Sequence, residues 1–298
     1  MTTAHVNGID IEYEVHGEDA GEPLLLVMGL GAQLIAWPDG FVELLVDRGY
    51  RVVRFDNRDV GLSTKLDGAT VDMGTTMAAV MSGQPVDAPY LLADMADDAF
   101  GLLDHLGIER AHIVGASMGG MIVQTMAIVR PERVRSMTSI MSTTGDRSVG
   151  QPTPEAMAVL MQPPPGERRA YIEHSIATSR VLWGSDTFEF PEEDARRRAG
   201  ITFDRCFYPA GTARQLVAIM ASGDRTEALR GCTVPTLVIH GDADPLVTYS
   251  GGEATAAAVP GARIVTVAGM GHTLPEPAWP QIVEELAAHA RASAGVVT

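Results

Sequence analysis

The chain has 298 residues, 46% hydrophobic and 20% charged, which is the balance of an ordinary globular protein and not of a disordered one. Its 22 Lys and Arg residues against 38 Asp and Glu residues give a net charge of −16, and no basic block appears anywhere. Because phosphate binding depends on Lys and Arg, this balance argues against a nucleic-acid partner. The two cysteines, Cys206 and Cys232, exclude a disulfide scaffold and a thiolate metal site, and they indicate a reducing compartment.

The length of the chain is compatible with one large α/β domain or with two small domains. The first eight residues have neither the basic nor the apolar region of a secretory signal. The longest apolar runs, such as residues 24–30, are too short to span a bilayer. We therefore expect a cytoplasmic protein without a transmembrane segment.

Strand and helix patterns alternate over the first 140 residues. Residues 5–16 predict two short strands around Asn7-Gly8, a type I′ hairpin turn, and residues 24–28 form a short apolar run typical of a strand buried on both faces. The elements expected after these are a helix at 37–48, a strand at 51–55, a helix at 91–106, a strand at 111–114, a helix at 118–129 and a strand at 134–140. This order predicts a parallel sheet with helices on both faces.

The alternation stops between residues 145 and 224, here called the cap segment. This stretch is richer in Pro and Arg, and its punctuation by Pro163-Pro164-Pro165 and Gly184 predicts several short helices. Alternation then returns, with a strand at 236–240, a helix at 253–259, a strand at 263–267 and a helix at 278–292. The simplest interpretation is one α/β domain, residues 1–144 and 225–298, interrupted by a helical insertion over the carboxyl ends of the strands, where open α/β sheets bind ligands.

A candidate nucleophile lies between a predicted strand and a predicted helix. Gly115-Ala116-Ser117-Met118-Gly119 fits the pattern G-x-S-x-G, and the strand at 111–114 leads directly into it. A nucleophile on so sharp a turn needs small neighbours, which the glycines supply. The alternative is a glycine-rich helix start with a serine N-cap.

A serine nucleophile needs a base, and the base needs an orienting carboxylate. Two loops that follow late strands offer both in the order serine, acid, histidine: Gly241-Asp242-Ala243-Asp244-Pro245 and Gly269-Met270-Gly271-His272. We prefer Asp244 as the acid, because Asp242 directly follows the strand and can instead cap the turn. His272 is the only histidine in a glycine-flanked loop after a late strand, whereas His112 and His240 fall within strands and are expected to be core or rim residues.

An oxyanion hole needs two backbone N–H donors. We expect one from Met118, the residue after the nucleophile, and one from Leu30 in the Gly29-Leu30-Gly31 turn after the first buried strand. The polar loop at 56–63 is expected to be a hydrogen-bonded scaffold beside that turn. Met73, Met77 and Met81 share one helix face, for which ordinary packing is the expected role, with an adaptable apolar pocket wall as the alternative. No cofactor and no metal ion are expected, because no dinucleotide or Walker fingerprint occurs in its required setting.

Taken together, these motifs resemble the α/β-hydrolase superfamily over nearly the whole chain. More narrowly, the chain is similar to the bacterial serine esterases that include aclacinomycin methylesterase and the mycobacterial lipase/esterases. The marks of that group are the Met28-Gly29 start of the oxyanion loop, the Trp37-Pro38 pair and the Arg58-Asp59 step, where many relatives have Arg-Gly. The resemblance implies a mostly parallel eight-stranded sheet with a helical cap inserted after the sixth strand.

By this resemblance Ser117, Asp244 and His272 are the catalytic residues, Leu30 and Met118 form the oxyanion hole, and the substrate is a small apolar carboxylic ester. Lactonase, thioesterase, C–C bond hydrolase and cofactor-free haloperoxidase share the triad and stay open as alternatives. A non-enzymatic alternative is a small-molecule receptor on the hydrolase fold. Haloalkane dehalogenases and epoxide hydrolases are disfavoured because they use Asp at the position of Ser117. A homodimer is left open.

Overall fold

The computed structural model describes residues 2–294, and its centre is one eight-stranded sheet in the order β1-β2-β4-β3-β5-β6-β7-β8. The strands are β1 (Thr2–Val6), β2 (Ile9–His16), β3 (Glu22–Val27), β4 (Tyr50–Phe55), β5 (Ala111–Ala116), β6 (Val134–Ile140), β7 (Thr236–Gly241) and β8 (Arg263–Val267). The β1–β2 and β2–β4 pairs are antiparallel, and all other pairs are parallel. The predicted α/β class with a mostly parallel eight-stranded sheet is therefore confirmed.

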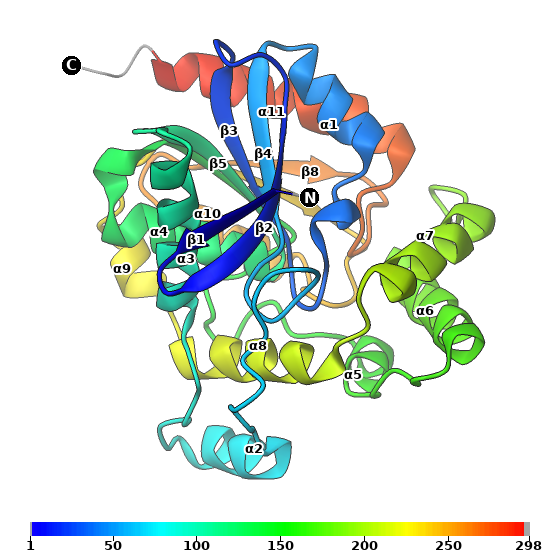
Figure 1. The fold of residues 1–298 in the computed structure, drawn as a ribbon. Helices are drawn as coiled ribbons and strands as arrows, with labels where there is room; N and C mark the ends of the chain where they lie inside the picture. The colour runs from blue at the N-terminus through cyan, green and yellow to red at the C-terminus, as the bar shows by residue number, and fades with distance from the viewer. Residues whose placement is uncertain (1, 295–298) are drawn as a thin grey trace.

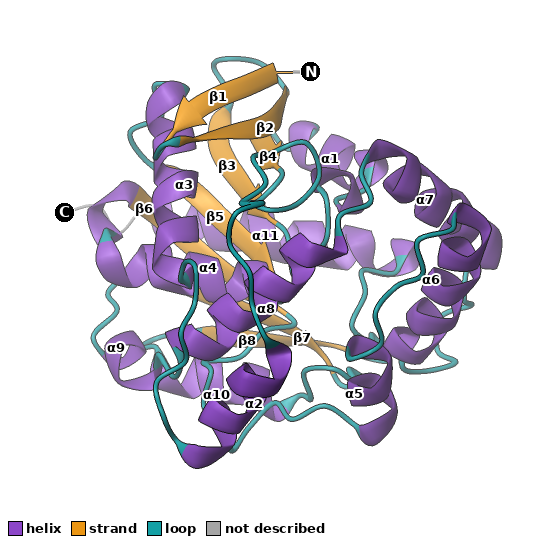
Figure 2. Cartoon of the chain, turned by 60° about the horizontal axis from the view of Figure 1, so that its bottom comes forward, coloured by secondary structure: helices purple, strands orange, loops and turns teal. Residues whose placement is uncertain are grey.

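Helices cover both faces of this sheet (Figures 1 and 2). Helices α1 and α11 pack on one face, and α3, α4, α9 and α10 pack on the other. The bounds of these helices are α1 (Asp39–Val46), α3 (Leu92–His105), α4 (Met118–Val129), α9 (Thr226–Arg230), α10 (Ser250–Ala258) and α11 (Trp279–Ala294).

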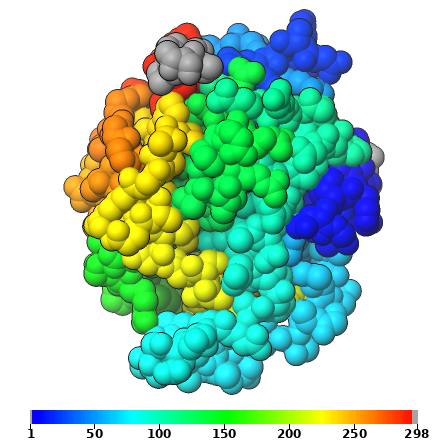
Figure 3. Space-filling view, turned by 90° about the vertical axis from the view of Figure 1, so that its left-hand side faces the viewer, coloured from blue at the N-terminus to red at the C-terminus, as the bar shows by residue number. Residues whose placement is uncertain are grey.

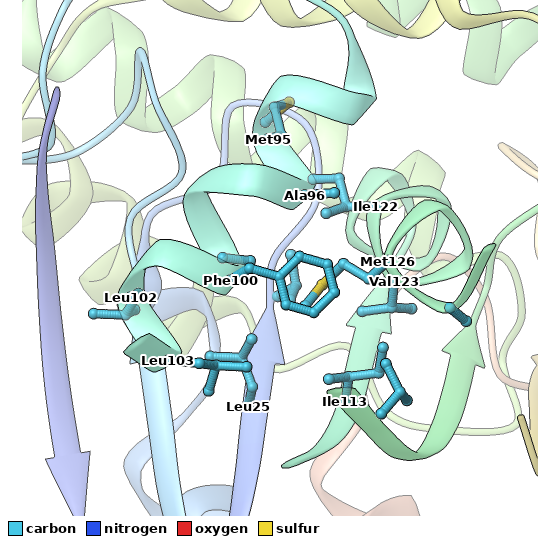
Figure 4. Close-up of a cluster of buried hydrophobic side chains, with 14 of the residues drawn as sticks. Leu25, Met95, Ala96, Phe100, Leu102, Leu103, Ile113, Ile122, Val123 and Met126 are labelled. Atoms are coloured by element: carbon cyan, nitrogen blue, oxygen red, sulfur yellow. The ribbon is translucent and has the colours of Figure 1, made fainter. Parts of the chain in front are cut away.

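Strand β3 shows why the sheet is buried on both sides. Successive side chains of a strand point to opposite faces. Leu25 and Val27 accordingly join the cluster under α3 and α4, while Leu24 and Leu26 join the cluster under α1 and α11. Figure 4 shows the first cluster, in which Phe100 is fully buried between helices and strands. An apolar run without alternation is what such a strand requires.

Local turn signals in the sequence agree with the structure. Asn7 (φ 48°) and Gly8 (φ 77°) turn the β1–β2 hairpin, and Gly107 (φ 67°) follows the end of α3. The helix expected over 37–48 is shorter than predicted: a 3₁₀ turn at Leu34–Ala36 precedes it, and α1 begins only after Pro38, whose extended backbone forms the N-cap.

The cap segment lies between β6 and β7 and contains α5 (Pro154–Leu160), α6 (Arg168–Trp183), α7 (Glu192–Arg205) and α8 (Pro209–Ser222). The expectation of short helices is wrong for three of these, since α6 has 16 residues and α7 and α8 have 14 each. Ile172, Ile176 and Ala199 form a small apolar cluster between α6 and α7. The four helices lie along the lower and right-hand side of Figure 1.

Helix α2 (Met73–Ser82) protrudes at the lower edge of Figure 3. Its three methionines do not form a buried stripe, because Met81 is 79% exposed and Met73 and Met77 are only partly buried. The expectation of ordinary packing is therefore wrong at Met81. None of the helices within residues 2–294 combines the length and apolar character needed to cross a membrane.

Candidate active site

Ser117 stands on a sharp turn between β5 and α4. It has φ 56° and ψ −120°, a backbone conformation that a residue with a side chain rarely adopts. A Cβ atom on Gly115 would lie 2.1 Å from the Gly119 carbonyl oxygen, and one on Gly119 would lie 2.0 Å from the Val27 carbonyl oxygen. The glycines that flank the serine are therefore required by the close approach of the backbone.

Two hydrogen bonds from neighbouring segments hold the strained residue. The Ser117 N–H donates to the Ile140 carbonyl at 2.9 Å, and the Ser142 hydroxyl donates to the Ser117 carbonyl at 2.8 Å. Sequence reasoning missed Ser142, whose only signal is its place two residues after the predicted strand at 134–140.

The structure brings Ser117, His272 and Asp244 into one hydrogen-bonded chain. His272 Nε2 lies 2.9 Å from Ser117 Oγ, and His272 Nδ1 lies 2.8 Å from Asp244 Oδ2. The three residues follow β5, β8 and β7 respectively, so they meet at the edge of the sheet where these parallel strands end. This series of hydrogen bonds requires the tautomer of His272 in which Nδ1 carries the proton and Nε2 accepts a hydrogen bond from the serine hydroxyl.

Asp244 is a buried carboxylate with donors on both oxygens. The backbone N–H groups of Leu246 and Val247 each donate to Oδ1 at 2.9 Å, which leaves Oδ2 for His272. Burial alone would raise the pKa of Asp244, but the neighbouring His272 and His240 outweigh burial and hold the pKa well below its usual range. Asp242, the competing carboxylate, instead accepts a 2.6 Å hydrogen bond from the Gly269 N–H and is not bonded to His272.

His240 lies behind Asp244, and the sequence predicted it only as a core or rim residue. It is fully buried, its Nε2 donates to the Val247 carbonyl at 2.8 Å, and the same atom lies 3.5 Å from Asp244 Oδ2. A histidine four residues before a candidate acid, at the end of a strand, was the signal that could have marked it. Within residues 2–294 no group of three or more His, Cys, Asp or Glu side chains could hold a metal ion.

The predicted oxyanion donors flank the serine. A Cβ atom on Gly29 would lie 3.0 Å from Ser117 Cβ and 3.5 Å from Ser117 Oγ, so the turn that carries Leu30 packs directly on Ser117. Met118 is the first residue of α4, where the N–H groups have no partner inside the helix. Among the described residues, neither the Leu30 nor the Met118 N–H donates to a protein acceptor.

The polar loop at 56–63 supports that turn, as predicted. Asp56 accepts hydrogen bonds from the Leu34 N–H (2.7 Å) and the Leu62 N–H (2.8 Å), and Asn57 donates to the Met28 carbonyl at 2.9 Å. Asp59 has φ 69°, the conformation that a glycine would adopt freely.

Helix α6 of the cap segment contacts the histidine loop. The His272 N–H donates to the Leu182 carbonyl at 2.7 Å, and the Ser185 hydroxyl donates to the Gly269 carbonyl at 2.7 Å. A Cβ atom on Gly271 would lie 2.1 Å from the Trp183 carbonyl oxygen. The loop that carries His272 is thus packed tightly against the last turn of α6.

Known proteins with this organisation match nearly the whole chain. The family described as alpha/beta hydrolase fold matches residues 22–277. Rhodomycin D methylesterase DauP from Streptomyces sp. (strain C5) is 31% identical over 302 residues, covering 93% of each chain.

Solved structures agree in fold. The meta-cleavage product hydrolase from Pseudomonas fluorescens IP01 superimposes with a TM-score of 0.74 at 20% identity, over 98% of both chains. A thermophilic esterase from Thermogutta terrifontis gives a TM-score of 0.72 at 22% identity, over 98% of this chain and 99% of the other. With the family match over most of its length, the chain belongs to the α/β hydrolase fold family.

Proposed function

We propose that this protein is a serine hydrolase that cleaves carboxylic esters through an acyl-enzyme on Ser117. The observation that carries the proposal is the unbroken hydrogen-bonded chain from Asp244 through His272 to the hydroxyl of a strained Ser117. The similarity of this protein to a methylesterase over 93% of the chain supports ester bonds as the target.

Acylation follows from the geometry of these groups. His272 Nε2 takes the proton from Ser117 Oγ as the oxygen forms a bond to the ester carbonyl carbon. The Leu30 and Met118 N–H groups then stabilise the negative charge on the carbonyl oxygen. When the intermediate collapses, the ester C–O bond breaks and the alcohol leaves with the proton from His272.

Deacylation repeats the sequence with water. His272 takes a proton from water, the resulting hydroxide attacks the acyl carbon, and the Ser117–acyl bond breaks as the proton returns to Ser117. Asp244 keeps its negative charge throughout, because its surroundings lower its pKa, and it stabilises the imidazolium that forms at both steps.

For the substrate we propose a methyl or other small alkyl ester, on the strength of the methylesterase relative. For the compartment we propose the cytoplasm, supported by the absence of a disulfide between Cys206 and Cys232. The homodimer left open by the sequence is tested by light scattering on the purified protein.

A fluorophosphonate probe tests the nucleophile. We expect rapid labelling of the folded protein and complete loss of labelling in Ser117→Ala, whose melting temperature should stay close to that of the parent. The same variant should lose roughly 10⁴-fold or more in kcat for any ester that the parent cleaves. Labelling or esterase activity that survives in Ser117→Ala would show that Ser117 is not the nucleophile.

A substrate panel tests the bond that is cleaved. The parent and Ser117→Ala are compared on p-nitrophenyl esters of increasing acyl length, methyl esters, lactones and thioesters. We expect the highest kcat/KM on oxygen esters, with Ser117-dependent turnover. Preference for lactones or thioesters over every oxygen ester would replace the esterase assignment by one of the alternatives that share the triad.

A further inference from the structure

Gln215, in α8 of the cap segment, is bonded to the loop that carries Leu30. Its side-chain oxygen accepts a 2.8 Å hydrogen bond from the Gly31 N–H, and its side-chain nitrogen donates to the Arg58 carbonyl at 2.8 Å. Gln215 is fully buried. A side chain from the cap segment therefore fills a gap in the hydrogen bonding of two core loops.

The bonded residue is part of a tight turn beside the nucleophile. The Ala32 N–H donates to the Gly29 carbonyl at 3.2 Å, and Gly31 has φ 65°. A positive φ at the third position occurs in type II and type I′ turns, and because Leu30 at the second position has no positive φ, the turn is type II; a type I turn has a negative φ at the third position. The two forms interconvert by rotation of the central peptide, which here joins Leu30 to Gly31. That rotation would reverse the directions of the Gly31 N–H and the Leu30 carbonyl.

The core alone does not fix this central peptide. Asn57 holds the loop before the turn through the Met28 carbonyl, and Asp56 holds it after the turn through the Leu34 N–H. Between these points the N–H of Gly31 is held by Gln215. A carbonyl oxygen brought to the same place by rotation would face the Gln215 oxygen and be repelled.

Helix α8 is itself fixed in place on the core. Arg214 makes a bidentate ion pair with Asp59, in which Nε donates to Oδ2 at 2.9 Å and Nη2 donates to Oδ1 at 2.7 Å. Both side chains are almost fully buried. Thr212 packs on the same turn, since a Cβ atom on Gly31 would lie 2.7 Å from its hydroxyl oxygen. Gln215 thus acts from a rigid support.

We infer that Gln215 is a positioning residue for the oxyanion hole: by bonding the Gly31 N–H and the Arg58 carbonyl it anchors the Gly29–Ala32 turn to the loop beside it, and it thereby fixes the place of the Gly29–Leu30 peptide, whose N–H is the proposed donor beside Ser117. The inference rests on the proposed ester hydrolase function. If Gln215 has this role, the oxyanion hole is complete only while α8 is docked on the core.

The test compares Gln215→Met with Gln124→Met. Gln124 is also fully buried, and it makes two side-chain hydrogen bonds, to Ser139 and Arg225, that involve no residue of the oxyanion loop. Both variants should lose thermal stability, because each leaves buried partners unsatisfied. Only Gln215→Met should lower kcat, by about 10- to 100-fold with KM within about threefold, since it disturbs a donor that acts in the transition state.

A trifluoromethyl ketone gives a second readout. It adds to the serine and forms an oxyanion, so its inhibition constant should rise in Gln215→Met by about the same factor as kcat/KM falls. The shape of the pH–rate profile should not change, because the Asp244–His272–Ser117 chain is untouched.

Gln215→Glu supplies the conservative variant. When protonated, its carboxyl group can accept from the Gly31 N–H and donate to the Arg58 carbonyl, and ionisation removes that donor. Both states keep an acceptor for the Gly31 N–H, and at pH 5.5 the bond to the Arg58 carbonyl is kept as well, so at pH 5.5 the kcat of Gln215→Glu should exceed that of Gln215→Met. This variant also serves if Gln215→Met does not fold.

The inference is overturned if Gln215→Met keeps kcat within twofold of the parent, or if Gln124→Met loses as much kcat as Gln215→Met. It is likewise overturned if Gln215→Glu loses as much kcat at pH 5.5 as Gln215→Met. Absence of Ser117-dependent turnover in the parent would instead refute the proposed function.

Discussion

Asp242 and Asp244 are two residues apart on one loop, yet their surroundings differ. Asp244 is buried, accepts from two backbone N–H groups and touches His272, whereas Asp242 is exposed and bonds the Gly269 N–H. A strand end followed by a turn leaves room for one carboxylate inside the fold and one at the surface. The chemical roles of the two residues should be separable by matched substitutions.

We predict that Asp244→Asn lowers kcat by roughly 10⁴-fold, because an amide at this position no longer selects the tautomer or stabilises the imidazolium. Asp242→Asn keeps an oxygen that can accept from Gly269, so its kcat should stay within about threefold of the parent. Steady-state kinetics of the two variants on one ester checks both statements. A comparable loss in both would show that the loop is needed as a whole.

Element packing sets the shape of the nucleophile turn. Helix α4 begins one residue after Ser117, and its first turn lies so close to β3 that Gly119 faces the Val27 and Met28 carbonyls. Helix α4 could not approach β3 so closely if residue 119 carried a side chain. The G-x-S-x-G pattern is therefore a packing requirement between two elements as much as a local turn signal.

Gly119→Ala should accordingly be severely destabilising, since its Cβ would lie 2.0 Å from a backbone oxygen that cannot move aside. We expect a loss of roughly 3 kcal/mol or more, or failure to fold. Gly68→Ala is the matched control, because a Cβ there meets no atom within 4 Å and the backbone has no positive φ. Denaturant unfolding of both variants measures the difference, and equal stability would contradict the packing argument.

Arg225 joins the end of the cap segment to the core through hydrogen bonds to uncharged oxygens. Its guanidinium donates to Gln124 Oε1 (3.1 Å), the Gly223 carbonyl (3.1 Å) and the Thr143 carbonyl (3.0 Å). Burial lowers the pKa of Arg225 to about 10, with Asp224 opposing that change, so the group stays charged at neutral pH.

Arg225→Met should leave those buried oxygens without their donor and cost about 2–3 kcal/mol of stability. Arg225→Lys should be about as unstable as Arg225→Met, since an ammonium cannot match the planar arrangement of three donors. Thermal unfolding checks this, with an expected drop of about 5 °C in both variants. A lysine variant as stable as the parent would show that charge alone suffices.

At the scale of the whole molecule, the position of the cap segment in the sheet order explains its contacts. It leaves the sheet after β6, which lies between β5 and β7, the strands that precede Ser117 and Asp244. An insertion that starts in the middle of this edge can reach loops on both sides. It does so through α6 at the histidine loop and through α8 at the Gly29–Ala32 turn.

Carboxylates decide how the whole molecule responds to acid. The pKa is lowered at Glu14, Asp72, Asp146, Glu167, Glu173, Asp194, Asp204 and Asp244, and it is raised at Glu12 and Asp98. A carboxyl group whose folded pKa is lowered stabilises the fold above its unfolded pKa of about 4, and that stabilisation is lost as the pH falls through the folded pKa. Carboxyl groups with a lowered pKa outnumber those with a raised pKa, so acid should destabilise the folded protein.

We predict that the free energy of unfolding falls as the pH is lowered from 5 to 3. The buried Asp244 should contribute up to about 1.4 kcal/mol per pH unit over the range in which it binds a proton only when unfolded. The decline should therefore be less steep in Asp244→Asn, which has no proton to bind. Urea unfolding at several pH values provides the comparison, and parallel curves for parent and variant would refute the contribution of Asp244.

The fold could be predicted, and the residues of the candidate site could be located, because their signals are local. An apolar run such as that of β3 marks a doubly buried strand, and a serine between two glycines at a strand–helix junction marks the turn. The carboxyl ends of parallel strands then meet at one edge, which brings the loops of Asp244 and His272 to Ser117 without further information.

The sequence by itself determined the α/β class, the order of the elements and the loops that carry Ser117, Asp244 and His272, since each depends on neighbours a few positions away. Only the tertiary structure decided which of Asp242 and Asp244 contacts His272, that His240 lies behind Asp244, and that Gln215 holds Gly31. Gln215 and Gly31 are 184 residues apart. No periodicity or spacing encodes a hydrogen bond over such a separation, because it depends on how α8 settles on the core as a whole.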